Sequence, residues 1–521
     1  MTALAAGLPT SLTNGLTTRL AERIIASGET TTRPVEVFTG APLAVLPTSS
    51  AEDVAAAVAA ARRAQPGWAA TDLGERRRVV RAFAGLVLAE RNTLLDLVQA
   101  ETGKARWDAF NEVLEPVLTA NYYLRKSAAL LRPQRREGML PLLVRAEERR
   151  GPKGVVGIIS PWNYPFALSI SDAIPALLAG NAVVVKPDSQ TSLSPLLGAE
   201  LLERAGLPSG VFQVVVGGPT TGGALVDHAD YIGFTGSSGS GRVVAERAAA
   251  RLIGCSLELG GKNAMIVLDD ADVAKAVAAA LPACFTNAGQ VCMAIERVYV
   301  HHDLYDEFTA RFVAATRALR LGHGYDFGYD VGALSSPRQL DVVTAYLDDA
   351  VSLGAQVRTG GRARPDLGPT FFEPTILTGV TSSMACSGAE VFGPVVAVAP
   401  FEDDEQALRL ANDSEYGLNA SVFGRDTERA RRLGTRLRAG TVNINDGFIA
   451  AYGSMDAPMG GMGSSGLGRR HGAEGLLKYT EAQTVAAQRG AWTQPPRWLP
   501  RARYAAVMAR AVRVLAKAGI R

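Results

Sequence analysis

The chain has 521 residues, too many for a single hydrophobic core, so two or three domains are expected. Its 47% hydrophobic and 20% charged residues are typical of a soluble globular protein, and a net charge of +3 argues against a nucleic acid as partner. Four scattered cysteines do not provide a disulfide framework or a zinc site, which favours a reducing compartment.

The N-terminal segment lacks the features of a secretory signal. The first charged residue is Arg19, so no basic region precedes an apolar core, and Pro9, Asn14 and Gly15 interrupt residues 1–18. No apolar run reaches the roughly 18 residues needed to span a bilayer. We therefore expect a cytoplasmic protein.

The first quarter of the chain is predicted to be helical after an irregular lead-in over residues 1–48. Ser49-Ser50 has the character of an N-cap for an alanine-rich helix from about 51 to 65, which Pro66-Gly67 should end. Two further helices are expected over 75–102 and 106–130. Charge and proline then break the periodicity, which predicts an extended arm over 132–150.

A change of period at Gly154 marks a different architecture. Short β-branched runs alternate with helical patterns, so βαβ units and a parallel sheet are predicted. The expected strands are 155–159, 183–185, 214–216 and 231–234, and the expected helices are 166–179, 194–205 and 240–252. Ligands bind such sheets at the carboxyl ends of the strands. Those ends carry Trp162-Asn163, Lys186-Pro187 and Thr235-Gly236-Ser237, which predicts a cofactor domain.

A second α/β alternation begins at Asn263 and runs to about residue 450, and a glycine-rich segment follows over 453–475. This alternation contains the stretch Asn287-Ala288-Gly289-Gln290-Val291-Cys292. A thiol at a turn has an open approach, and nearby backbone N–H groups can stabilise its thiolate, so Cys292 is a candidate nucleophile. The alternative is a small buried hydrophobe, as most unpaired cysteines are.

Four other positions are open to a functional and a structural interpretation. Glu258, between two leucines, is either a desolvated general base or the outward residue of an alternating strand. Asn163 is either an oxyanion donor or a helix N-cap. Lys186 either snorkels or binds a ribose or phosphate. The glycine-rich run 236–241 is either a phosphate cradle at a helix end or a flexible turn.

Taken together, these segments are specific. The ordered set resembles the aldehyde dehydrogenase superfamily over about residues 35–490, and it is most similar to bacterial NADP-dependent succinate-semialdehyde dehydrogenases, in a divergent branch. The matching segments are Pro161-Trp162-Asn163, Val185-Lys186-Pro187, Phe234-Thr235-Gly236-Ser237, Leu257-Glu258-Leu259-Gly260-Gly261-Lys262, Gly289-Gln290-Val291-Cys292 and Glu390-Val391-Phe392-Gly393-Pro394.

The resemblance implies a covalent mechanism. Cys292 attacks the aldehyde carbon, Asn163 and the backbone N–H of Cys292 hold the oxyanion, and Glu258 activates the water that hydrolyses the thioester. The resemblance also implies which residues contact an NADP or NAD cofactor: Trp162, Asn163, Lys186, Pro187, Asp188, Ser189, Gly236, Ser237, Leu259, Glu390 and Phe392. No metal is implied.

The same resemblance implies the fold class and the domains. An α/β fold is expected, with an open parallel-sheet cofactor domain (1–131 and 152–262), an α/β catalytic domain (263–465) and a small bridging arm (132–151 and 475–490). The arm pairs subunits in the family, so a homodimer or homotetramer is expected.

The cofactor and substrate preferences rest on single positions. NAD-preferring relatives often carry a glutamate three residues after the lysine, where Ser189 stands here and removes a repulsion against a 2′-phosphate, although Asp188 is adjacent. Typical succinate-semialdehyde enzymes hold the distal carboxylate with two arginines, and Ser171 and Thr286 occupy those positions here. Arg297 is one alternative partner for that carboxylate.

Three alternatives to a succinate-semialdehyde dehydrogenase are open. A broad-range enzyme for aliphatic or aromatic aldehydes shares the same chemistry. A CoA-acylating enzyme usually lacks the base, so Glu258 argues against it. A non-enzymatic relative should have lost Cys292, Glu258 or Asn163, and all three are present.

The tail over residues 491–521 lies outside the family pattern. From Arg497 to Arg521 it has six arginines, one lysine and no acidic residue. Pro500 can begin a helix, beyond which an apolar stripe and a basic stripe recur at helical spacing. Such a helix either docks on the protein's own surface, or is disordered, or lies weakly on an anionic membrane surface.

Overall fold

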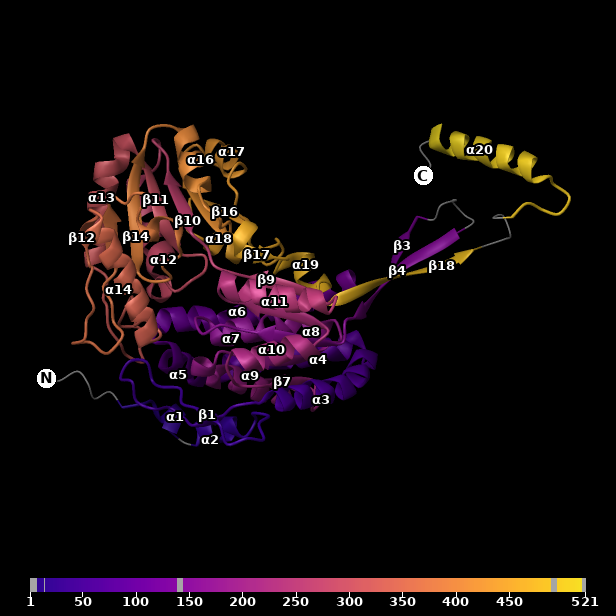
Figure 1. The fold of residues 1–521 in the computed structure, drawn as a ribbon, viewed down its shortest axis with the longest axis horizontal. Helices are drawn as coiled ribbons and strands as arrows, with labels where there is room; N and C mark the ends of the chain where they lie inside the picture. Colours follow the sequence, from indigo (N-terminus) through magenta and orange to yellow (C-terminus); the bar gives the residue numbers. More distant parts are fainter. Residues whose placement is uncertain (1–6, 14, 138–143, 489–493, 518–521) are drawn as a thin grey trace.

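The computed structural model describes residues 7–13, 15–137, 144–488 and 494–517 (Figure 1). Two α/β bodies lie side by side, and a long arm projects from the junction of the first body with the C-terminal segment. Parts of the predicted lead-in (1–6), arm (138–143) and tail (491–493 and 518–521) lie outside the described residues.

The first body is built on a six-stranded sheet in the order β17-β9-β8-β5-β6-β7. Its strands are β5 Val155–Ile159, β6 Ala182–Lys186, β7 Phe212–Val214, β8 Tyr231–Thr235, β9 Gly254–Glu258 and β17 Gly466–Leu467. All neighbours are parallel except β17 and β9. Ile159 is opposite both Lys186 and Phe234, so the carboxyl ends of the three central strands share one edge.

Helices cover both faces of this sheet because its strands alternate two sets of buried side chains. Val156 and Val183 face the cluster packed by α4, α5, α6, α8 and α9, whereas Val155 and Val184 face α3, α10 and α11. The helices are α3 Ala51–Ala70, α4 Leu73–Ala89, α5 Arg91–Thr102, α6 Arg106–Leu131, α7 Pro165–Ile170, α8 Ala173–Leu178, α9 Leu193–Arg204, α10 Pro219–His228 and α11 Ser238–Ala250.

Three predicted helices differ from the structure. Helix α3 begins after Ser50 in a capping box, as expected, but continues through Pro66 to Ala70. Trp68 is buried and donates to the carbonyl of Leu177 at 2.9 Å, so packing of this last turn outweighs the cost of the proline. The pattern over 75–102 is two helices broken at Glu90, and that over 166–179 is two helices broken at Ser171–Asp172.

The second body is built on a seven-stranded sheet in the order β12-β13-β14-β11-β10-β15-β16. Its strands are β10 Asn263–Val267, β11 Ile295–His301, β12 Gln356–Thr359, β13 Thr375–Thr378, β14 Val395–Phe401, β15 Asn419–Phe423 and β16 Thr441–Ile444. Only β12 runs antiparallel to its neighbour. The helices are α12 Val273–Phe285, α13 His302–Arg317, α14 Pro337–Ser352, α15 Ala385–Gly388, α16 Asp404–Asn412, α17 Thr427–Gly434 and α18 Ile449–Tyr452.

The projecting arm is a three-stranded antiparallel sheet in the order β18-β4-β3. Its strands are β3 Gln134–Arg136, β4 Val144–Pro152 and β18 Thr480–Gln488, and Thr480 lies opposite Pro152 at its base. Eight consecutive residues of β18 are exposed. The short helix α19 Gly472–Leu477 connects the glycine-rich segment to this strand. The α/β fold class with a separate arm, as expected from the sequence, is confirmed.

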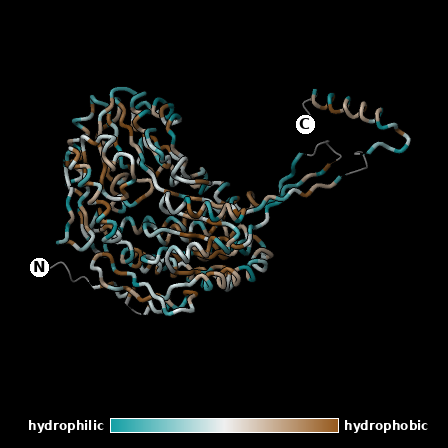
Figure 2. Tube along the Cα trace, in the orientation of Figure 1, coloured by the Kyte–Doolittle hydropathy of each residue, from teal (hydrophilic) through white to brown (hydrophobic). Residues whose placement is uncertain are grey.

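The two ends of the chain carry small elements. The lead-in forms α1 Thr10–Thr13, α2 Leu16–Ala21 and the pair β1 Thr31–Thr32 with β2 Leu46–Pro47. The tail forms α20 Arg501–Lys517, beginning after Pro500 as predicted. None of its residues is buried, and it lies beyond the arm rather than on either body, so docking on its own chain is not observed (Figures 1 and 2). Among the described residues, no helix has the length and apolarity needed to cross a bilayer.

Candidate active site

The loop before Cys292 has an uncommon backbone. Asn287, Ala288 and Gly289 are all left-handed, with φ of 52°, 53° and 73°. A Cβ at Gly289 would overlap the carbonyl of Gly393, so this loop and the Glu390–Pro394 loop touch directly. The N–H of Asn287 donates to Asp108 Oδ2 at 2.9 Å. Such backbone is costly and persists where surrounding contacts fix it, as they do here.

The Asn163 amide is held against this loop. Its Nδ2 donates to the carbonyl of Gln290 at 3.0 Å, two residues before the thiol. The amide has two N–H donors, and this bond uses one of them. The second N–H makes no hydrogen bond among the described residues.

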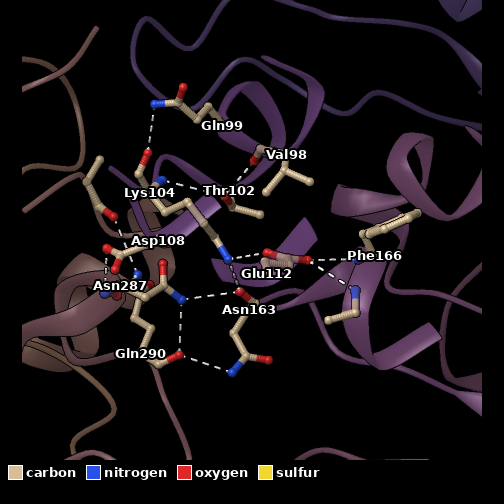
Figure 3. Close-up of polar contacts among 12 residues, drawn as sticks. Val98, Gln99, Thr102, Lys104, Asp108, Glu112, Asn163, Phe166, Asn287 and Gln290 are labelled. Atoms are coloured by element: carbon tan, nitrogen blue, oxygen red, sulfur yellow. Dashed lines mark hydrogen bonds and ion pairs between the residues drawn. The ribbon is translucent and has the colours of Figure 1, made fainter. Parts of the chain in front are cut away.

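Lys104 is a buried lysine that was not predicted from the sequence, and it binds the backbone of Asn163 (Figure 3). Lys104 is fully buried, and its Nζ donates to the carbonyl of Asn163 at 2.7 Å and forms an ion pair with Glu112. Glu112 in turn accepts from the N–H of Phe166 at 2.9 Å at the start of α7. Lys104 lies in the loop before α6, whereas Glu112 lies within that helix, so no helical spacing marks the pair in the sequence.

The Cys292 thiol is partly buried among apolar side chains. Met293, Phe448 and Met459 form the cluster on which it packs, with Tyr452 at its margin. Burial, together with the carboxylates of Glu390 and Glu258, raises the pKa of the thiol to about 12. The thiol is therefore protonated near neutral pH and needs a base to become a nucleophile.

Glu258 has the properties of such a base. It ends β9, and both of its carboxylate oxygens are buried without a hydrogen-bond partner among the described residues. Burial raises its pKa to about 7, against the attraction of Arg470. Carboxylates with a pKa close to the operating pH make effective general bases. Of the two sequence-based interpretations, a buried carboxylate is observed and an outward-facing one is not.

Lys186 and the three residues after it lie at the carboxyl edge of the first sheet. Lys186 is 9% exposed, and burial lowers its pKa although Asp188 opposes the change. Asp188 is committed locally, because its Oδ1 accepts from the N–H of Gln190 at 3.0 Å. Ser189 follows in a short 3-10 turn and is partly exposed. The segment Lys186-Pro187-Asp188-Ser189 therefore offers one ammonium and one hydroxyl toward this edge.

Strand β8 leads into the N-terminus of α11. Ser237 caps this helix by accepting from the N–H of Ser240 at 3.3 Å. Leu259 covers the first turn so closely that a Cβ at Gly241 would overlap it. The free N–H groups of this turn, next to Gly236 and Ser237, form a surface suited to a phosphate.

The Glu390 loop closes the same edge from the second body. Glu390 accepts from the N–H of Gly261 at 2.9 Å, and a Cβ at Gly260 would overlap its carboxylate. Burial raises the pKa of Glu390 to about 8. Phe392 has a left-handed φ of 54° and meets Trp162 edge to face, with ring centroids 5.4 Å apart.

These donors fit a dinucleotide cofactor. A lysine, a hydroxyl, a capped helix N-terminus and an aromatic pair converge where β5, β6 and β8 end, beside the point where the chain switches from one side of β5 to the other. That is where open α/β sheets bind nucleotides. The sequence placed Trp162, Lys186 and Ser237 at the ends of these strands, and β5, β6 and β8 do end at one edge, whereas Phe392 reaches it from the second body.

The three residues considered as ligands for a substrate carboxylate have different surroundings. Ser171 donates its hydroxyl to Glu115. Arg297 donates to the carbonyls of Lys262, Leu410, Ala411 and Asp413 and is buried, so it is a structural residue and the interpretation of Arg297 as a carboxylate ligand is wrong. Thr286 is partly buried at the start of the thiol loop.

Comparisons with known proteins agree with this site. The sequence profile described as "Aldehyde dehydrogenase family" matches residues 24–485, so the chain belongs to the aldehyde dehydrogenase family. Members of this family oxidise small-molecule aldehydes with NAD(P), and they are typically oligomeric.

Two relatives and one solved structure illustrate the similarity. A Mycobacterium ulcerans (strain Agy99) protein named "Putative succinate-semialdehyde dehydrogenase (NADP(+)) 2" is 54% identical over 89% of this chain and 90% of its own. A Methylomonas sp protein named 4,4'-diapolycopene aldehyde oxidase is 37% identical over 90% of this chain and 88% of its own. The crystal structure of succinate-semialdehyde dehydrogenase from Burkholderia pseudomallei is 34% identical, with a TM-score of 0.86 over 89% of this chain and 95% of that one.

Proposed function

We propose that this enzyme oxidises an aldehyde to the carboxylic acid through a thioester on Cys292, with NADP as the cofactor. The observation that carries the proposal is the placement of the thiol between a bound amide donor, Asn163, and a buried carboxylate without a partner, Glu258. Each of the two half-reactions needs one of these groups.

In the first half-reaction, Glu258 accepts the thiol proton and the sulfur of Cys292 bonds to the aldehyde carbon. The negative oxygen is stabilised by Asn163 Nδ2 and the backbone N–H of Cys292. NADP, when bound, would supply the hydride acceptor, and loss of hydride from the carbon would leave a thioester on Cys292. Glu258 then releases the thiol proton to solvent. In the second half-reaction it takes a proton from water, the hydroxyl adds to the thioester carbon, and the carbon–sulfur bond breaks to release the acid, while Glu258 returns that proton to the sulfur.

The cofactor is held at the sheet edge described above. Lys186 and Ser189 would meet the adenosine ribose and its 2′-phosphate, and Pro187 and Asp188 shape the same turn. Gly236, Ser237 and Leu259 would contact the pyrophosphate, and Trp162, Asn163, Glu390 and Phe392 would contact the nicotinamide half. NADP is favoured because Ser189 is neutral and because Asp188 is already bonded to Gln190.

Succinate semialdehyde is the first substrate candidate, supported by the name of the Mycobacterium ulcerans relative and by the Burkholderia structure. An uncharged, apolar aldehyde is the second, supported by the site itself. Met459, Phe448 and Tyr452 surround the thiol, and neither Ser171 nor Thr286 supplies a positive charge. The Methylomonas relative is named for a different aldehyde, so the names of relatives cover more than one substrate.

A substrate panel distinguishes the two. Initial rates with succinate semialdehyde, hexanal and benzaldehyde are measured with NADP and with NAD, and compared as kcat/KM. A preference for succinate semialdehyde supports the first candidate, and a preference for hexanal or benzaldehyde supports the second. Absence of oxidation of all three with either cofactor would contradict the proposal.

We infer that the domains and the assembly follow the same plan. Residues 1–131 with 152–262 bind the cofactor, 263–465 carry the thiol, and 132–151 with 475–490 form the association arm. The exposed strand β18 supports the arm's role, because an unpaired edge strand is a ready partner for another subunit. Light scattering should give a dimer or a tetramer.

The tail has the composition of a weak membrane contact. Helical spacing over α20 groups Tyr504, Val507 and Leu515 on one side and Arg510 and Arg513 on another, and the helix has no acidic residue. Trp498 before it is 79% exposed. Full-length protein should sediment with anionic liposomes at low salt and be released at high salt. Protein truncated after Gly490 should stay in the supernatant and keep its activity, and equal behaviour of both forms would refute the contact.

A further inference from the structure

A buried ion pair lies beside the proposed base and has no part in the mechanism so far. Arg470 and Asp172 are 8% and 7% exposed, and the guanidinium binds the carboxylate through two nitrogens, with Nε 3.1 Å from Oδ1. Lys478 Nζ is 3.9 Å from the same carboxylate. The cluster therefore combines two cations with one anion.

The backbone places this pair next to Glu258. Thr235 is the direct ladder partner of Glu258 between β8 and β9, and Arg470 Nη2 donates to Thr235 Oγ1 at 3.3 Å. Arg470 also pairs with Met459 in a two-residue bridge, with N–O distances of 2.9 and 2.6 Å. The intervening Gly460 lies over the Glu258 carboxylate, since a Cβ there would be 3.1 Å from Oε1.

Stability alone does not account for the pair. Burying two charges costs free energy that their attraction only partly returns, and well-packed apolar side chains are often as stable. Asp172 sits at the break between α7 and α8, where the sequence predicted one continuous helix. When a helix predicted to be continuous breaks at a buried charged residue, the break points to a functional constraint.

We propose that Arg470, oriented by Asp172, is a positioning residue that keeps the Glu258 carboxylate ionised and directed toward the thiol and the hydrolytic water. The inference rests on the proposed function of Glu258. Because the carboxylate has no hydrogen-bond donor of its own among the described residues, a fixed neighbouring cation is what opposes its protonation.

The direction of the pKa shift expected on loss of Arg470 follows from the charges around Glu258. Arg470 and Lys478 lower its pKa, Asp172 raises it, and the more exposed Arg469 lowers it least. The remaining titratable neighbours, Cys292 and Tyr231, are neutral at pH 7 because their pKa values are raised by burial. Loss of Arg470 should therefore raise the pKa of Glu258 above about 7 and leave the base mostly protonated in neutral solution.

The test follows the pH dependence of ester hydrolysis, which needs the thiol and the base but no cofactor. With p-nitrophenyl acetate, the burst of p-nitrophenol reports acylation of Cys292 and the steady state reports hydrolysis of the acetyl thioester. In the pH profile of the steady-state rate, Arg470→Gln should move the acid limb to higher pH by about one unit. Arg470→Lys, which keeps the charge, should restore most of the wild-type limb.

Three controls separate electrostatics from folding. The matched change Arg469→Gln removes a neighbouring arginine and should shift the limb much less. Asp172→Asn/Arg470→Gln removes both members of the bidentate pair, so Asp172 is not left buried without Arg470, and the double variant should fold even if Arg470→Gln does not. Its limb should lie between those of wild type and Arg470→Gln, since the raising effect of Asp172 is also gone.

Two outcomes overturn the inference. One is an Arg470→Gln enzyme, folded by its melting temperature, whose limb coincides with wild type while its rate falls at every pH. The other is a double variant that retains the wild-type limb. Either result leaves the proposed function standing if Cys292 is still acylated, whereas wild-type protein that releases no burst of p-nitrophenol contradicts the proposed function itself.

Discussion

Replacing Glu258 by glutamine should separate the two half-reactions. The amide has nearly the same shape but cannot accept a proton, and the carboxylate it replaces is buried without partners, so no ion pair is broken. With a pKa of about 7, the wild-type carboxylate is about half ionised at pH 7. Loss of a general base typically costs about 10²–10⁴ in rate, so steady-state turnover should fall by at least about 100-fold.

The first turnover should survive but become dependent on solvent base. Burial, the largest cause of the raised thiol pKa, is unchanged by the substitution. Below that pKa the thiolate fraction rises tenfold per pH unit, so the burst rate of the variant should rise about tenfold between pH 7.5 and 8.5. Wild-type burst rates should change much less over the same interval.

Stopped-flow absorbance at 340 nm measures both quantities. Glu258→Gln should give a burst of about one NADPH per active site followed by a slow steady state. A burst that is missing even at pH 9 would refute the prediction that solvent base can replace Glu258 in the first half-reaction. A variant that turns over at a near-normal rate without a burst would refute the assignment of Glu258 itself, because Glu258 would then not be needed for hydrolysis of the thioester.

The remaining predictions concern single side chains. Cys292→Ser should lose all but a few per cent of dehydrogenase activity while NADP still quenches its tryptophan fluorescence, since alkoxides form far less readily than thiolates. Ser189→Glu should shift the ratio of kcat/KM from NADP toward NAD; a wild-type enzyme that strongly prefers NAD would contradict the premise. Lys104→Met should destabilise the fold by about 3–5 kcal/mol in urea because it leaves Glu112 buried and unpaired. Lys104→Met/Glu112→Gln should recover much of this loss, and equal stability of the single and double variants would show that the pair is not the cause.

Local sequence patterns predicted three strands of the first sheet well, whereas the strand expected at 214–216 lies two residues earlier, as β7 Phe212–Val214. The β-branched runs beginning at 155, 183 and 231 correspond to β5, β6 and β8 within one or two residues. These strands are buried on both faces, and such strands have continuous apolar sequences. Helix ends were less well predicted. The proline at 66 is a local stop signal, yet the packing of Trp68 overrides it, and that contact with Leu177 is more than 100 residues away in sequence.

The residues that support the site could not be read from local patterns. Cys292, Asn163 and Glu258 stand at turns or strand ends, where the sequence marks them. Lys104 and Arg470 contact the site only through the tertiary fold: one reaches the carbonyl of Asn163 and the other reaches Asp172, 298 positions away. In the sequence these two residues are indistinguishable from ordinary charged surface residues, and only the structure shows that they are buried.

The arm has a consequence for the order in which the protein is made. Strand β18 pairs with β4 from Thr480 opposite Pro152 to Gln488 opposite Val144, so the whole thiol-bearing body lies between the two strands in sequence. During synthesis, β4 emerges long before its partner and presents an open edge. Both bodies can fold as units while the ribosome is still translating, but the arm closes only once the last tenth of the chain is available. The association proposed for this arm would therefore follow synthesis of the last strand, and chains that stop before residue 480 should fold their bodies and remain unassembled.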